Sequence, residues 1–321
     1  MVVDRRGVFV IDFRYHIVSL VAVFLALAIG IVIGGFSLRG QVGDSLNAQV
    51  TQLRSEKNTL RGQASQSAAA TKQRDAYIGA VLPTVVTGSL IHKSVAIVVL
   101  PGTDDALVRS TTTTVKTAGG SVASTSYLSK DWAAAGFSSK EGIPGLATAL
   151  HIDSSDTSAD RLPGTVLGKA VAGGSPQKST ASAAGVLPQL VKDQVISVHP
   201  ARPAGASAVV VLWSPMSAGN NNGDAITAWT NLVAAVGASV NAVVGVSAGD
   251  VGDDPSTPDA LVTALRRTPD SAARMSTIDD GDLSMGQGAM ALALRDELHG
   301  KSGQYGVAHD ATATLPKDLG K

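Results

Sequence analysis

The apolar residues of this chain form one long uninterrupted stretch near its beginning. Ile17 to Phe36 has the sequence IVSLVAVFLALAIGIVIGGF, which contains no charged residue. Twenty helical residues rise about 30 Å, the thickness of the hydrocarbon core of a bilayer. The pattern predicts a transmembrane helix in contact with lipid, preceded by a tail of residues 1–16.

A cleaved signal peptide is the alternative interpretation of this stretch. Ala26, Leu27 and Ala28 form an A-x-A pattern, but eight mostly apolar residues follow it. The apolar region of a signal peptide is usually about 7–15 residues long and ends at its cleavage site. We therefore expect an uncleaved anchor.

The basic residues around the apolar stretch predict its orientation. Arg5, Arg6 and Arg14 precede it, whereas Arg39 is the first basic residue after it. Because basic residues are retained on the cytoplasmic side, we expect a cytoplasmic N-terminus and an extracytoplasmic body.

Residues 42–78 have a different pattern, which is polar and helical. Leu46, Val50, Leu53 and Leu60 follow the alternating four- and three-residue spacing of a coiled-coil seam. The spacing predicts a coiled-coil stalk that joins two or three copies into a homo-oligomer. The alternative is an amphipathic helix that lies on the chain's own globular domain.

Strand and helix patterns then alternate over residues 90–306. Strand, helix and strand are predicted at residues 94–100, 105–118 and 121–128, and again at 208–213, 224–236 and 239–246. A helix at 258–267, a strand at 274–278 and a helix at 284–298 follow. This order predicts an α/β fold, a Rossmann-like duplicated βαβ domain with a mainly parallel sheet.

Two segments of the chain have no clear pattern. Residues 133–192 are rich in Gly, Ser and Ala, which predicts an irregular insertion or a hinge rather than a separate core. Residues 307–321 are expected to form a flexible tail.

Composition excludes several classes of function. The 26 basic and 26 acidic residues cancel, so the chain has no basic field for nucleic acid. The absence of cysteine excludes thiol catalysis and thiolate metal ligation.

Two glycine motifs resemble catalytic or cofactor-binding motifs. Residues 245–249 match G-x-S-x-G, but a nucleophile elbow requires a helix directly afterwards, and turn residues follow here. Residues 286–291 match G-x-G-x-x-A, but within a helix rather than after a strand. We expect a tight turn and close helix packing, with no catalytic or cofactor-binding residue.

Candidate metal ligands are scattered along the chain. Asp279, Asp280 and Asp282 precede the last helix without the spacing of a calcium loop, and we expect them to cap that helix. The soft ligands that copper prefers form no H-x-H, H-x₃-H or M-x-x-M pattern. They are His16, His92, His151, His199, His299 and His309, with Met216, Met275, Met285 and Met290.

Five segments resemble the actinobacterial copper transport outer-membrane protein family, which is named after mycobacterial copper transport protein B. They are residues 13–20 (FRYHIVSL), 53–57 (LRSEK), 276–282 (STIDDGD), 291–294 (ALAL) and 300–306 (GKSGQYG). The similarity implies copper transport or efflux and copper homeostasis without enzymatic activity, copper as the transported ion, and a location in an outer membrane of the mycobacterial type. It assigns no metal ligand.

A second hypothesis remains beside the copper role. In it the chain is a coiled-coil α/β scaffold that binds another cell-envelope or division protein, without direct copper chemistry. Copper-dependent protection of growth favours the first hypothesis, and a defect in cell shape without copper sensitivity favours the second.

Overall fold

The structure is a computed structural model of the 321-residue chain. It describes residues 13–132, 142–153, 157–173, 181–200, 205–219, 222–249 and 259–317. The chain divides into two units, residues 1–71 and residues 72–321.

The described residues of the first unit lie in a single helix, α1 (Phe13–Val86), and the last fifteen residues of this helix are part of the second unit. Among the described residues, one segment of it, Arg14–Gly34, is long and apolar enough to cross a membrane. The side chains of this segment are exposed, as they are for the seam residues Leu46, Val50, Leu53 and Leu60. The apolar helix predicted from the sequence is confirmed.

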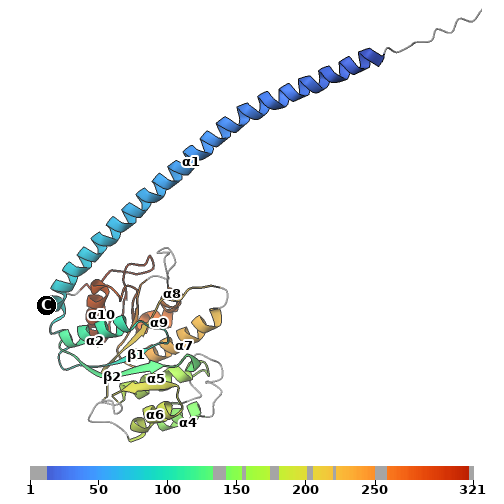
Figure 1. The fold of residues 1–321 in the computed structure, drawn as a ribbon. Coiled ribbons are helices and arrows are strands. Elements are labelled where there is room, and N and C mark those ends of the chain that lie inside the picture. Colours follow the sequence, from blue (N-terminus) through green and yellow to red (C-terminus); the bar gives the residue numbers. More distant parts are fainter. Residues whose placement is uncertain are drawn as a thin grey trace, which may run out of the picture. The chain divides into compact units, whose positions relative to one another are not determined.

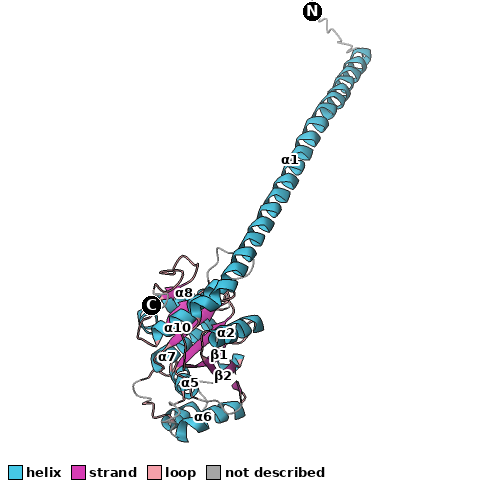
Figure 2. Cartoon of the chain, turned by 90° about the vertical axis from the view of Figure 1, so that its left-hand side faces the viewer, coloured by secondary structure: helices cyan, strands magenta, loops and turns pink. Residues whose placement is uncertain are grey.

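The described residues of the second unit form a seven-stranded sheet. Figures 1 and 2 show this sheet with helices packed around it. The strands lie in the order β3-β2-β1-β4-β5-β6-β7, and every neighbouring pair is parallel except β2 and β3. Their bounds are β1 Ser94–Val99, β2 Ser121–Leu128, β3 Ile196–His199, β4 Ala208–Trp213, β5 Val243–Ser247, β6 Ser276–Ile278 and β7 Gln304–Tyr305. The mainly parallel sheet predicted from the sequence is confirmed.

Two apolar clusters cover the two faces of this sheet. In β1 and β4 alternate side chains point to opposite faces, so Ile97 and Val210 enter one cluster while Val98 and Val211 enter the other. One face packs against the end of α1 and against α2 (Asp105–Thr117) and α10 (Ser284–Glu297). The opposite face packs against five helices, which are α4 (Gly142–Ala149), α5 (Leu162–Ala172), α6 (Ala181–Lys192), α7 (Gly223–Ser239) and α8 (Ala260–Arg267). Both faces of the central strands are therefore buried, which explains their continuous runs of valine.

The described residues of the segment expected to be an irregular insertion, 133–192, are largely helical. η1 (Lys130–Trp132) directly precedes this segment, which contains α4 (Gly142–Ala149), α5 (Leu162–Ala172) and α6 (Ala181–Lys192). Gly164 and Gly168 allow α5 to pack closely against α7 (Gly223–Ser239), because a Cβ at Gly164 would lie 2.3 Å from the Leu232 carbonyl oxygen. The prediction was wrong because small residues that pack helices together resemble loop composition in a sequence.

The segment after β7 is also packed on the body, at least through residue 317. The backbone of Tyr305 pairs with Ala313, and Asp310 contacts Arg266 of α8 (Ala260–Arg267). The predicted flexible tail is therefore wrong for residues 307–317, which are held by side chains distant in sequence; residues 318–321 lie outside the described residues.

Candidate functional site

The carboxyl edge of the sheet is where α/β proteins place their ligands, at the point where the strand order reverses. That point lies here between β1 and β4. The Thr103 hydroxyl donates to the carbonyl oxygens of Leu100 at 2.6 Å and Leu212 at 3.2 Å, so it links the two strand ends. Asp104 accepts from the Ala106 amide at 2.7 Å and caps α2. Both polar side chains of this turn therefore have structural roles.

A buried carboxylate, Asp259, organises the neighbouring strand ends. Its Oδ2 accepts from the Trp213 indole at 2.6 Å, and its Oδ1 accepts from the amides of Met216 at 3.1 Å and Leu261 at 3.0 Å. Burial raises the pKa of the Asp259 carboxyl, against the opposing effects of these donors and the Ser247 hydroxyl. Ser247 of the G-x-S-x-G motif is fully buried at the end of β5, so it is not presented as a nucleophile.

Arg266 is the central cation at the β6 and β7 side of the same edge. Its guanidinium donates to the Thr277 hydroxyl at 2.9 Å and the Tyr305 carbonyl oxygen at 2.7 Å. It also pairs with Asp279 at 2.8 Å and with Asp310. The Arg266 side chain is 3% exposed, so these acceptors replace the water that it loses on folding.

The first carboxylate after β6, Asp279, holds the segment that follows β7. Its Oδ1 accepts from the amides of Val307 at 2.7 Å and Ala308 at 3.2 Å. Gly306 has φ +130°, and a Cβ there would lie 2.1 Å from the same oxygen. The close approach of backbone and carboxylate therefore requires glycine at this position.

Asp280 has the most unusual environment of the three clustered carboxylates. Its side chain is 1% exposed, and neither of its carboxyl oxygens has a hydrogen-bond partner. Burial, together with the charge of Asp279, raises the pKa of Asp280 to about 7. This carboxyl group can therefore exchange a proton near neutral pH.

The expected capping of α10 by Asp279 and Asp280 was wrong. The cap is Asp75 of α1, whose Oδ1 accepts from the Ser284 amide at 2.6 Å and whose Oδ2 accepts from the Ser284 hydroxyl at 3.2 Å. The predicted close helix packing of the G-x-G-x-x-A motif is confirmed, because a Cβ at Gly288 would lie 2.9 Å from the Leu82 side chain.

Replacement of Asp75 by alanine should lower the free energy of unfolding of the body by about 1 kcal/mol, the usual cost of a lost helix cap. The three tryptophans, Trp132, Trp213 and Trp229, all lie in the body, so their fluorescence during denaturation by urea measures this change. Arg74→Ala, on an exposed neighbouring position of α1, is the matched control. Equal effects of the two changes would contradict the capping role.

One hollow of the body lies beside β7. It has a volume of about 410 Å³ and a mixed polar lining of Asp296, Lys301, Ser302, Gly303, Tyr305, Thr312, Ala313, Leu315 and Lys317. Nearby, the Ser276 hydroxyl donates to buried Glu297 at 2.6 Å, and burial raises the pKa of Glu297 to about 7. The lining offers charged and hydroxyl groups to a small polar ligand, and it contains neither imidazole nor thioether.

The six histidines lie on several different elements of the chain. All six histidine side chains are exposed, on segments from α1 to the residues after β7. Met275 and Met290 are fully buried on opposite faces of the sheet. Within the part of the chain that the structure describes, no group of three or more His, Asp or Glu side chains is placed to hold a metal ion. The described residues therefore do not fit a resident copper site.

The sequence did not single out Arg266, Asp259 or Asp75. Asp259 could have been found as a capping residue, since it directly precedes a helical pattern. The other two could not, because the acceptors of Arg266 and the helix that Asp75 caps are distant in sequence.

Comparison with known proteins gives a match over nearly the whole chain. The model of the family described as "Copper transport outer membrane protein, MctB" matches residues 10–316. The copper transporter MctB of Mycobacterium tuberculosis H37Rv is 30% identical over 323 residues, which cover 94% of this chain and 98% of that protein. The copper transporter MctB of Mycobacterium leprae is 30% identical over 325 residues, covering 96% of this chain and all of that protein.

Proposed function

Because the chain belongs to the MctB family of copper transport outer membrane proteins, we propose that it is a membrane-anchored, non-enzymatic protein of copper transport and copper homeostasis. The observation that carries this proposal is the match to the family over residues 10–316. The relatives are named as copper transporters, and no enzymatic activity is part of their names.

The proposal divides the chain into parts with different tasks. Residues 17–36 contact lipid, residues 42–78 form the stalk, and residues 90–306 form the body. The arginines on either side of the apolar segment support a cytoplasmic N-terminus and an extracytoplasmic body. The repeated units β1–α2–β2 and β4–α7–β5 support a duplicated, Rossmann-like origin of the body.

The route of copper through this protein is constrained by the body. Helices cover both faces of its sheet, so the sheet presents no surface to lipid and no wall to a pore. The described residues contain one apolar helix long enough to cross a membrane, and one such helix cannot line an aqueous channel alone. We therefore propose that the body acts on copper beside the membrane and does not itself form a pore. We also propose that the chains self-associate through Leu46, Val50, Leu53 and Leu60.

Growth of a strain that lacks this protein tests the function. We expect the strain to tolerate several-fold less copper than its parent, and the full chain to restore tolerance. A chain with three arginines in place of Val23, Leu25 and Leu27 should not restore it, because each arginine at the centre of a membrane helix costs about 2.5–3.5 kcal/mol.

Unchanged copper tolerance together with altered cell shape would contradict the copper role and support the scaffold hypothesis.

Calorimetric titration of the full chain in lipid nanodiscs with Cu(I) and Cu(II) shows whether copper binds directly. Since the described residues form no metal cluster, we expect no saturable site with a Kd below about 1 µM, or about −8 kcal/mol.

A further inference from the structure

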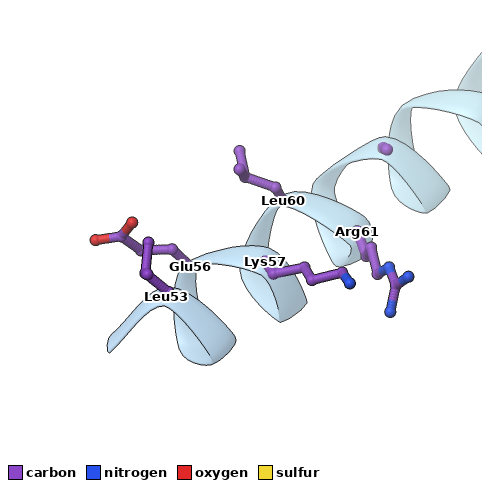
Figure 3. A pocket seen from close by; sticks show the side chains of 6 residues that line it. Leu53, Glu56, Lys57, Leu60 and Arg61 are labelled. Atoms are coloured by element: carbon purple, nitrogen blue, oxygen red, sulfur yellow. The ribbon is translucent and has the colours of Figure 1, made fainter. Parts of the chain in front are cut away.

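An apolar stripe on α1 in the first unit of the chain is exposed. Leu46, Val50, Leu53 and Leu60 are 54%, 40%, 64% and 63% exposed, although each is apolar. Leu53 and Leu60, with the side chains between them, line a groove of about 470 Å³ along the helix (Figure 3). In heptad notation the three leucines are at d positions, and Val50, Lys57 and Ala64 are at a positions.

The residues at the seam favour two strands. A β-branched residue at a with leucine at d is the pattern of parallel dimers. Lys57 lies at the a position between Leu53 and Leu60 and lines the same groove (Figure 3). In a two-stranded coil its ammonium group can extend past the seam to water, whereas a trimer would enclose three such groups at its axis.

The charges beside the seam favour a parallel, in-register arrangement. Glu56 is at a g position and Arg61 is at the e position five residues later, the pair that meets across a parallel dimer. Within one helix, ion pairs form between residues three or four apart. The residues at this spacing from Glu56 are all uncharged, so Glu56 has no cation to pair with in its own helix; they are Gln52, Leu53, Thr59 and Leu60. An antiparallel pair would instead bring e positions together, which places Arg54 and Arg61 against each other.

We propose that residues 46–64 of α1 pair with the same residues of a second copy as a parallel, in-register, two-stranded coiled coil. Lys57 limits the number of strands, and two contacts between Glu56 and Arg61 of opposite chains set their direction. This inference rests on the self-association in the proposed function, to which it adds the number of chains and their direction. Anchoring both chains in one membrane raises their effective concentration, which compensates for the short seam.

Cysteine cross-linking of the full chain in membranes tests the direction of pairing. The natural chain has no cysteine, so any disulfide cross-link in a single-cysteine variant comes from the introduced residue. We expect Leu46→Cys and Leu60→Cys each to form a disulfide-linked dimer with itself on oxidation with diamide, and Thr59→Cys on the outer face not to do so. Cross-links that form only between Leu46→Cys and Leu60→Cys chains would show antiparallel pairing and overturn the proposal.

Mass measurement of the full chain in nanodiscs tests the number of strands and the residues that set it. We expect two copies, an association at least tenfold tighter for Lys57→Ile, and no change for Asn58→Ile on the outer face. Glu56→Arg should weaken association about five- to tenfold, and adding Arg61→Glu should restore it. Three copies, or equal effects of the Lys57 and Asn58 changes, would overturn the proposal.

A monomer in both measurements would overturn the pairing altogether. It would leave the copper role unaffected, because neither measurement involves copper and the growth assay is scored separately.

Discussion

Replacement of Arg266 by alanine is expected to lower the free energy of unfolding of the body by about 3–5 kcal/mol, the usual cost of breaking a buried ion pair by removal of one partner. The guanidinium is nearly inaccessible and contacts Thr277, Tyr305, Asp279 and Asp310. Its loss leaves the buried carboxylate of Asp279 without a counter-charge. Tryptophan fluorescence during urea denaturation of the full chain measures the loss.

The neighbouring arginine provides the matched control for this prediction. Arg267 is exposed at the end of α8, so Arg267→Ala should change the free energy of unfolding by about 0.5 kcal/mol or less. Adding Asp279→Asn to Arg266→Ala should recover part of the lost stability, because it removes the unpaired charge. Equal losses for the two arginine variants would show that Arg266 is not the organising cation.

The body is expected to lose stability as the pH rises from 5 to 8, by about 2–4 kcal/mol. Burial raises the pKa of Asp280 from 3.8 to about 7 and that of Glu297 from 4.5 to about 7. A carboxyl group with a raised pKa in the folded state binds its proton more tightly there than in the unfolded chain. Its contribution is therefore complete below pH 4 and is lost as the pH passes through 7.

The variant Asp280→Asn tests this pH dependence directly. An amide cannot ionise, so we expect the variant to be about 2 kcal/mol more stable than the natural chain at pH 8 and to show a shallower decline. Asp224→Asn, at an exposed position of α7, is the control and should leave the decline unchanged. A natural chain that is equally stable at pH 5 and pH 8 would contradict the prediction.

Local patterns predicted most of the strands of the body. β4 has the predicted bounds, because a run of buried β-branched residues identifies a central parallel strand without knowledge of its neighbours. β2 also has the predicted bounds, although its burial is partial and it has an antiparallel neighbour. The start of β5 was misplaced by four residues, because residues 239–242 belong to the end of α7 and the turn after it. β3 was not predicted, because four residues of alternating burial at a sheet edge are too short to recognise.

By itself, the sequence determined the elements whose environment is uniform along their length: the apolar segment of α1 and the buried strands β1 and β4. The tertiary structure alone decided the sites. Arg266 pairs with Asp310, and Asp75 caps α10 although it lies 209 residues before Ser284 in the sequence. Both contacts form only once the sheet is assembled. A local apolar pattern shows which segments leave water, but it contains no information on which distant polar group completes a buried charge.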